Sequence, residues 1–216
     1  MIRSSALIAC LVASPAAACD LALALAVDVS ASISPSEYAL QMGGLADALQ
    51  HPEVADALVH ARAAVMLVQW SGQERQHVSI PWTQVASYDD LTRLAAEVRD
   101  APRAWALYST AIGEALVFTA AEFSTAPQCA RHVIDVSGDG SSNEGRLPQL
   151  ARVPIIDAGV TINALAIESN VRGLTTYFEE NVIGGPNAFV ERADNYADYP
   201  RAIQLKLLRE VVKPAS

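Results

Sequence analysis

Three separate stretches of the chain carry oxygen-bearing side chains in a pattern that suits a metal ion. The first stretch holds Asp28, Ser30 and Ser32 at alternate positions, so one carboxylate and two hydroxyls can point the same way as the chain leaves a strand. Thr110 opens a later helical segment, and Asp139 lies in the glycine-rich turn 137–140. Two carboxylates and three hydroxyls, without sulfur or imidazole, are hard ligands suited to Mg²⁺, Mn²⁺ or Ca²⁺. Five such side chains leave room in an octahedral shell for water and one outside ligand.

Each of these residues also has an ordinary structural explanation. Asp28 can cap the turn that follows it, and Ser32 or Ser34 can cap a helix. Asp139 can belong to a simple turn. Singly, such roles are commoner than metal binding. Together with Thr110 the set favours a metal site, because a buried cluster of unpaired carboxylates is costly.

Patterns typical of other catalytic chemistries are absent from the sequence. No serine-nucleophile elbow, phosphate-binding loop or dinucleotide fingerprint occurs. The four histidines are scattered and form no zinc-binding pair: His51, His60, His77 and His132. A metal-assisted hydrolase is the alternative function, and it needs a general base near a metal-bound water. The candidates for that base are Glu144, Asp135 and Glu168.

The elements that must position the oxygen-bearing residues alternate regularly along the chain. Continuous apolar runs predict strands buried on both faces, and cap residues followed by helical spacing predict helices. Strands are expected at 21–29, 61–70, 77–82, 131–136, 161–167 and 188–191. Helices are expected at 35–50, 89–99, 110–123, 147–158, 175–182 and 196–212. Pro81 suits the third strand to a sheet edge.

This alternation predicts an α/β fold with a doubly wound, mostly parallel sheet, helices on both faces and one short antiparallel edge strand. The sequence has no internal repeat or composition shift, so residues 19–216 are expected to form a single domain. Ligands of such sheets bind outside the carboxyl ends of the strands. The loops that contain Asp28, Thr110 and Asp139 are expected at that edge. Asp135, inside an apolar strand, is expected to make a structural hydrogen bond with His132, Arg131 or a helix start.

Composition and charge exclude several classes of protein. The chain has 216 residues, of which 51% are hydrophobic and 18% charged, so it can bury a core and is not a disordered chain. A net charge of -9 argues against nucleic acid, which needs clustered basic residues, and against an anionic membrane surface.

The N-terminal residues 1–18 have the pattern of a secretory signal peptide. Arg3 precedes a short apolar stretch, Pro15 follows, and three small residues end at Ala18. Cleavage there predicts a periplasmic or secreted protein without a transmembrane segment. It leaves Cys19 and Cys129, which in an oxidising compartment form either a disulfide or two unpaired thiols.

The three oxygen-bearing stretches resemble the metal-ion-dependent adhesion site of the von Willebrand factor type A domain. Their order, and separations of roughly 80 and 30 residues, match that site. The stretch 134–140, with the secretory start, is similar to the bacterial branch known as DUF1194. One departure is Gly138, which stands where the family often has threonine, so a supporting hydroxyl is lost or moved to Ser137.

The resemblance implies a binding module rather than an enzyme. Hydroxyls of Ser30, Ser32 and Thr110 would hold Mg²⁺, or Mn²⁺ or Ca²⁺, and Asp28 and Asp139 would bind it directly or through water. A partner protein would supply an acidic residue to the open position of the cation.

The strand order of that family also bears on the two cysteines. In it the first and fourth strands are parallel neighbours, which implies a disulfide between Cys19 and Cys129.

Overall fold

In the part of the chain that the structure describes, six strands form one sheet in the order β3-β2-β1-β4-β5-β6, and only β3 runs antiparallel to its neighbour. The computed structural model describes residues 19–169 and 171–211. The predicted signal peptide therefore lies outside the described residues. The strands are β1 (Cys19–Asp28), β2 (Ala64–Trp70), β3 (Gln76–Gln84), β4 (Cys129–Gly138), β5 (Val160–Ile167) and β6 (Val190–Ala193). The predicted fold class, with its antiparallel edge strand, is confirmed.

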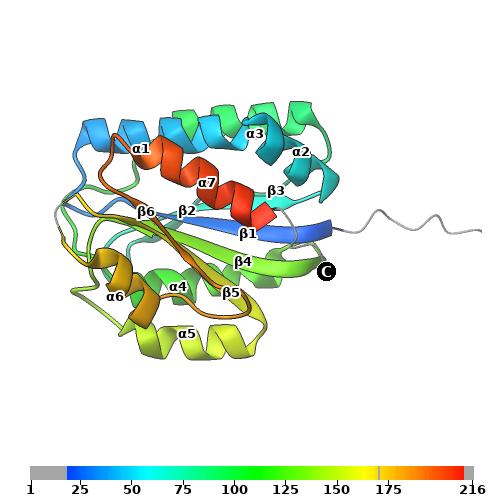
Figure 1. Cartoon of the computed structure of the whole chain (residues 1–216). Helices are drawn as coiled ribbons and strands as arrows, with labels where there is room; N and C mark the ends of the chain where they lie inside the picture. Colours follow the sequence, from blue (N-terminus) through cyan, green and yellow to red (C-terminus); the bar gives the residue numbers. More distant parts are fainter. Residues whose placement is uncertain (1–18, 170, 212–216) are drawn as a thin grey trace, which may run out of the picture.

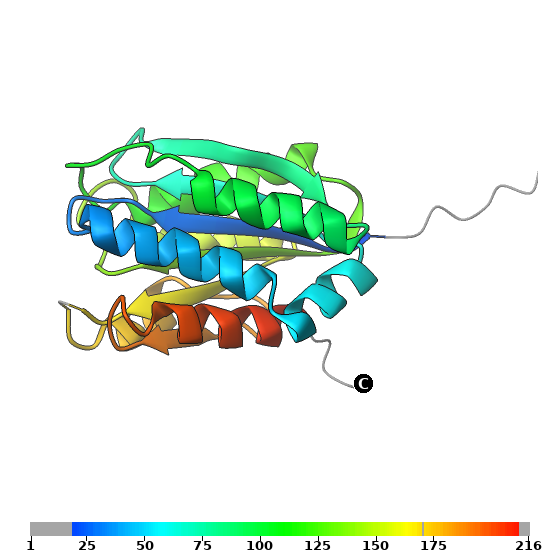
Figure 2. The same ribbon diagram turned by 90° about the horizontal axis from the view of Figure 1, so that it is seen from above.

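Helices cover both faces of this sheet (Figure 1). One layer contains α1 (Pro35–Leu49), α2 (Pro52–His60), α3 (Tyr88–Asp100) and α7 (Tyr199–Val211). The other contains α4 (Ile112–Ala121), α5 (Pro148–Asp157) and α6 (Leu174–Asn181), with a short 3₁₀ turn at Glu122–Thr125 after α4. Viewed from above, α1, α3 and α7 lie side by side over the strands (Figure 2).

The two layers explain the apolar sequence of β1. Leu21, Leu23 and Leu25 pack in the core beneath α1, α3 and α7, whereas Ala24 and Ala26 pack against the layer of α4 to α6. Successive side chains of a strand point to opposite faces. Because both faces are covered, the strand reads as one continuous apolar run.

Several expectations for the elements were wrong in detail: β2 begins at Ala64 rather than residue 61, and α4 begins at Ile112 rather than residue 110. Helix α2 was not predicted, although Pro52 at its first position and the spacing of Val54 and Leu58 are helical signals. Strand β3 is longer than expected, and a register irregularity opposite Val65 and Leu67 accommodates Pro81, which is exposed. Helix α7 begins at Tyr199 rather than residue 196, because residues 194–198 form a hydrogen-bonded turn.

A disulfide joins the amino ends of the two central strands. Cys19 and Cys129 are register partners on β1 and β4, with their Cα atoms 4.4 Å apart, and their sulfurs are bonded. The disulfide that the family resemblance implied is therefore present in the structure. It lies at the edge of the sheet opposite to Asp28. Within 19–169 and 171–211, every helix is too short or too polar to cross a membrane.

Candidate metal centre

The carboxyl ends of β1 and β4 bring the two predicted aspartates together. Val27 pairs with Ser137 across the two strands, so Asp28 lies opposite Gly138 and Asp139 follows one residue later. The Ser32 hydroxyl donates to Asp139 Oδ1 over 2.7 Å, which joins the first loop to the third.

The first loop is folded around its own aspartate. The Ser30 amide donates to Asp28 Oδ1 over 2.7 Å, and the Ser30 and Ser32 hydroxyl oxygens are 3.3 Å apart. Arg103 holds the backbone of this loop by donating to the carbonyls of Val29, Ser30 and Ile33. The alternate spacing read from the sequence therefore corresponds to a fixed turn with its oxygens gathered.

Thr110 joins the same group from the loop before α4. Its amide donates to Asn143 Oδ1 over 3.0 Å, and the Asn143 amide donates back to the Thr110 carbonyl over 2.9 Å. A Cβ atom placed on Gly140 would lie 3.9 Å from Thr110 Oγ1, so the threonine hydroxyl faces the turn that contains Asp139. The structure thus brings all five predicted residues to one edge of the sheet.

The two carboxylates are buried without a neutralising partner. Asp28 and Asp139 are 0% and 2% exposed, and the Oδ2 atom of each accepts no hydrogen bond. Across residues 19–169 and 171–211, no Lys or Arg forms an ion pair with either. Burial, and then the charge of Asp139, raise the pKa of Asp28 to about 7. Burial also raises the pKa of Asp139, against the hydrogen bond from Ser32.

The chemistry of these oxygens is suited to a divalent cation. Two inward-facing carboxylate oxygens and three hydroxyls are hard donors, and a cation would relieve the repulsion between the aspartates. The described part of the chain has no cluster of three or more His, Cys, Asp or Glu that could hold a metal. A cation at this site would therefore depend on the serine and threonine hydroxyls as well as on the two aspartates.

Gly138 has a steric reason for its departure from the family pattern. A Cβ atom there would lie 3.1 Å from Asp28 Oδ2, 3.5 Å from the Trp70 ring and 3.6 Å from the Phe178 ring. Trp70 and Phe178 are fully buried and fill the space that a larger residue would need. A side chain at position 138 would therefore crowd Asp28 and the two aromatic rings.

The sequence reasoning missed Tyr196, which lies between β6 and α7. Its side chain is 3% exposed, and its buried hydroxyl interacts with the Asp139 carboxylate. Burial, followed by the charges of Asp139, Asp28 and Glu37, raises the pKa of this phenol. Its place after the last strand, at the same carboxyl edge, was the available signal.

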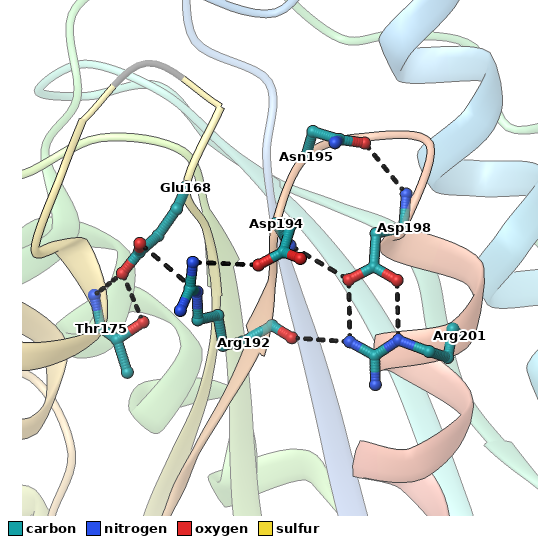
Figure 3. A network of polar contacts seen from close by, with 7 residues as sticks. All are labelled: Glu168, Thr175, Arg192, Asp194, Asn195, Asp198 and Arg201. Atoms are coloured by element: carbon teal, nitrogen blue, oxygen red, sulfur yellow. Dashed lines mark hydrogen bonds and ion pairs between the residues drawn. The ribbon is translucent and has the colours of Figure 1, made fainter.

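A polar network holds the loop that carries Tyr196 (Figure 3). Arg201 donates to both carboxylate oxygens of Asp198 and to the Arg192 carbonyl. Asp198 accepts from the Asp194 amide and donates its own amide to Asn195. These bonds fix both sides of Tyr196, so its phenol is held against the two aspartates rather than left in a free loop.

The expected partners of Asp135 were wrong. Lys206 of α7, fully buried, lies 2.5 Å from both Asp135 Oδ1 and Glu210 Oε1, and Asn163 donates to Glu210 over 3.2 Å. Burial raises the pKa of Asp135 against the effect of Lys206, and burial with the charge of Asp135 raises that of Glu210 to about 7. Lys206 lies far along the chain, and nothing local to Asp135 indicates it.

The other two candidate general bases are also engaged. Glu144 accepts a hydrogen bond from the Gln73 amide over 3.0 Å. Glu168 accepts from the amide and hydroxyl of Thr175 and pairs with Arg192 at 3.4 Å (Figure 3). All three candidates therefore make structural contacts.

One known protein family matches nearly the whole chain. The model of the family described as "Protein of unknown function (DUF1194)" matches residues 18–215. The chain belongs to the DUF1194 family. No significant match was found among curated proteins.

Solved structures place this DUF1194 chain in the von Willebrand factor type A fold. Proximal thread matrix protein 1 from the mussel byssus is 19% identical with a TM-score of 0.68, over 89% of this chain and 48% of that one. A form of it described as having a zinc-occupied adhesion motif is 21% identical, with a TM-score of 0.67, over 89% and 49%. A von Willebrand factor type A protein from Catenulispora acidiphila is 15% identical, with a TM-score of 0.66, over 91% and 44%.

A bacterial adhesin shares the fold as well. The pilus adhesin SpaC from Lactobacillus rhamnosus GG is 12% identical, with a TM-score of 0.62, over 89% of this chain and 30% of its own. The DUF1194 chain spans half or less of the length of each of these proteins. At these identities the likeness shows the fold alone.

Proposed function

We propose that this protein is a metal-dependent binding module. Asp28, Ser30, Ser32, Thr110 and Asp139 hold one divalent cation, and a partner protein supplies an acidic residue to its open position. The observation that carries the proposal is the pair of buried carboxylates, whose Oδ2 atoms lack hydrogen-bond partners in the described structure.

The electrostatics of the site support a carboxylate as the incoming group. A bound dication supplies a Lewis-acidic position for an oxygen ligand. Asp28 and Asp139, once ionised, balance its two charges, so a net neutral centre faces the solvent beside Ser32. An acidic side chain then gains the metal contact without meeting an uncompensated negative charge.

The comparisons support a divalent cation as the ligand of this site, but they do not single out one ion. Since the mussel byssus protein is described with zinc in its adhesion motif, zinc joins magnesium, manganese and calcium among the ions to test. The donor set here has no nitrogen or sulfur, which favours the harder ions.

Binding is favoured over hydrolysis because the candidate bases are occupied. Asp135 pairs with a buried lysine, and Glu168 is held by Thr175 and Arg192. Glu144 accepts a backbone amide. The secretory pattern of residues 1–18 and the Cys19–Cys129 disulfide favour a location outside the cytoplasm.

Thermal unfolding with added cations tests the proposal. A cation at about 100 times its Kd adds about 2.7 kcal/mol of stability, which raises the Tm of a domain of this size by roughly 5–10 °C. We expect this rise for wild type with Mg²⁺ or Mn²⁺, and its loss in Asp139→Asn and Ser32→Ala.

The control for these variants is Asp157→Asn at the exposed end of α5, which removes the same charge away from the site. It should keep the full shift. A wild-type Tm that none of the four cations moves would contradict the proposal, as would an equal shift in Asp139→Asn.

A further inference from the structure

The segment 102–110 is anchored firmly at both ends. Near its start, Gln69 donates to the Pro102 carbonyl and accepts the Ala104 amide, over 2.9 and 2.8 Å. Near its end, the Tyr108 carbonyl accepts the Ala31 amide over 2.9 Å, and the Ser71 hydroxyl donates to the Ser109 carbonyl over 3.0 Å. The residues between these anchors form a held tip rather than a loose loop.

Leu107, at this tip, combines two unfavourable features. Its side chain is 87% exposed, the highest value among the large hydrophobic residues of the described chain. Its φ angle is 84°, in the left-handed region where residues with a Cβ are strained. Glycine or asparagine would suit this backbone better. A strained, exposed leucine contributes nothing to folding, and strain of this kind gathers at binding sites.

The tip lies beside the candidate metal centre. Ala31, whose amide binds the Tyr108 carbonyl, stands between Ser30 and Ser32, and Thr110 follows two residues after Tyr108. Tyr108 is 43% exposed, and the Arg75 guanidinium lies 4.7 Å from the centre of its ring. An apolar side chain, an aromatic ring and a cation thus border the site on one side.

We infer that Leu107, Tyr108 and Arg75 form a contact surface for the partner segment that reaches the metal. The inference rests on the proposed function and specifies its partner: a protein segment whose acidic residue has a large apolar residue one or two positions away. The acidic residue binds the cation, the apolar side chain covers Leu107, and Arg75 offsets the negative charge of this chain, which is -9 overall.

Two variants separate the contact from the fold. Leu107→Asn removes the apolar surface and relieves the strain of the left-handed backbone. We therefore expect a Tm between that of wild type and about 2 °C above it. Leu205→Asn on α7 removes another exposed leucine, 44% accessible, from a regular helix away from the site. It should lower the Tm slightly and leave binding unchanged.

The probes are short peptides with blocked ends. Their binding to the protein is measured by NMR chemical-shift titration, first in Mg²⁺ and then in EDTA. The reference peptide has one glutamate among glycines, and the others add one phenylalanine at one or two positions on either side of it. We expect a phenylalanine peptide to bind wild type about fivefold or more tightly than the reference. That gain should disappear in Leu107→Asn and persist in Leu205→Asn.

The outcomes separate this inference from the proposed function. Mg²⁺-dependent binding of the reference peptide with no gain from phenylalanine, or a gain that survives Leu107→Asn, overturns the contact surface and leaves the metal site standing. Failure of every peptide to bind in Mg²⁺ overturns both the surface and the carboxylate-binding role. Self-association that Leu107→Asn abolishes would make a second copy the occupant and would overturn the partner specified here.

Discussion

Two pairs of buried carboxylates adjoin the central sheet, and within residues 19–169 and 171–211 only one pair is bound to a lysine. Asp135 and Glu210 share the ammonium group of Lys206 in the interior between the sheet and α7. Asp28 and Asp139, equally buried, face hydroxyls and a phenol at the carboxyl edge and form no such ion pair in the described structure. The same desolvation raises the pKa in each pair.

The difference between the two pairs shows which carboxylates need a cation from solvent. The interior cluster has its own cation, so its negative charge is balanced by Lys206 and by protons, as the raised pKa values of its carboxyls indicate. The edge pair adjoins the exposed Ser32 and can exchange its partner with solvent. A buried carboxylate that pairs with a lysine therefore indicates a structural role. A buried carboxylate surrounded only by neutral oxygens indicates a binding role.

Removing Lys206 is expected to have the largest effect. Lys206→Met leaves Asp135 and Glu210 without their cation, and breaking a buried ion pair costs about 3–5 kcal/mol. Urea unfolding at pH 8 measures the loss, which should shrink at pH 5 because protons then neutralise the carboxyls.

The combined variant Lys206→Met, Asp135→Asn, Glu210→Gln is the control for this effect. It removes all three charges and should recover most of the lost stability. A loss below about 1 kcal/mol in Lys206→Met would show that the interior pair does not depend on its lysine, and the contrast between the two regions would fail.

The second prediction concerns Asp28 in metal-free protein. The folded state keeps a proton on Asp28 up to about pH 7, whereas the unfolded chain releases it near the ordinary value of 3.8. The unfolded state binds fewer protons in this interval, so stability falls as the pH rises through it and the loss is complete above about 7. This difference in pKa between the folded and unfolded states corresponds to at most about 4 kcal/mol in the free energy of unfolding. Asp28→Asn lacks this component and should be the more stable protein at pH 8 in EDTA.

Subtracting the two pH curves removes the contributions of Asp135 and Glu210, which titrate in both proteins, and leaves that of Asp28 with its coupling to Asp139. Added Mg²⁺ should restore stability to wild type at pH 8 and leave Asp28→Asn unchanged. Parallel curves for the two proteins between pH 4 and about 8 would mean that burial of Asp28 carries no charge penalty.

The smallest effect is expected from Tyr196. Tyr196→Phe removes one buried hydroxyl, so the free energy of unfolding of the metal-free protein should change by only about 1 kcal/mol. The phenol lies beside Asp139, and loss of such a supporting group should weaken Mg²⁺ binding about tenfold, measured by calorimetry. Tyr199→Phe is the matched control, since that buried phenol lies toward Asp135 instead. Equal Mg²⁺ affinities in the two variants would remove Tyr196 from the site.

Much of the fold could be predicted because its signals are local. The apolar runs of β1, β2 and β5 mark buried parallel strands, and Ser34, Pro35 and Glu37 mark the start of α1 with its capping box. Helix α2 escaped because it is short and follows α1 almost directly. The exact start of α7 depended on hydrogen bonds of Asn195 and Asp198 that no periodicity reveals.

The residues of the candidate site also fall into two groups, those that local motifs predict and those that only the tertiary structure reveals. Asp28, Ser30 and Ser32 form a motif within five residues, and the strand-end position of Asp139 and the position of Thr110 before a helix follow from the alternation of elements. The roles of Tyr196, Asn143 and Arg103 rest on contacts with residues far away in the chain. Such contacts leave no trace in the spacing of any one segment.

The sequence by itself determined the alternating elements and predicted the secretory start and the set of oxygen ligands, because hydrophobic periodicity and short motifs act over a few neighbouring residues. Only the tertiary structure decided which buried carboxylate meets Lys206 and which two remain without a cation, and it alone displayed Leu107 beside the latter. The physical reason is that charge compensation and exposure depend on distances through space, and these are set by the packing of elements far apart in the chain.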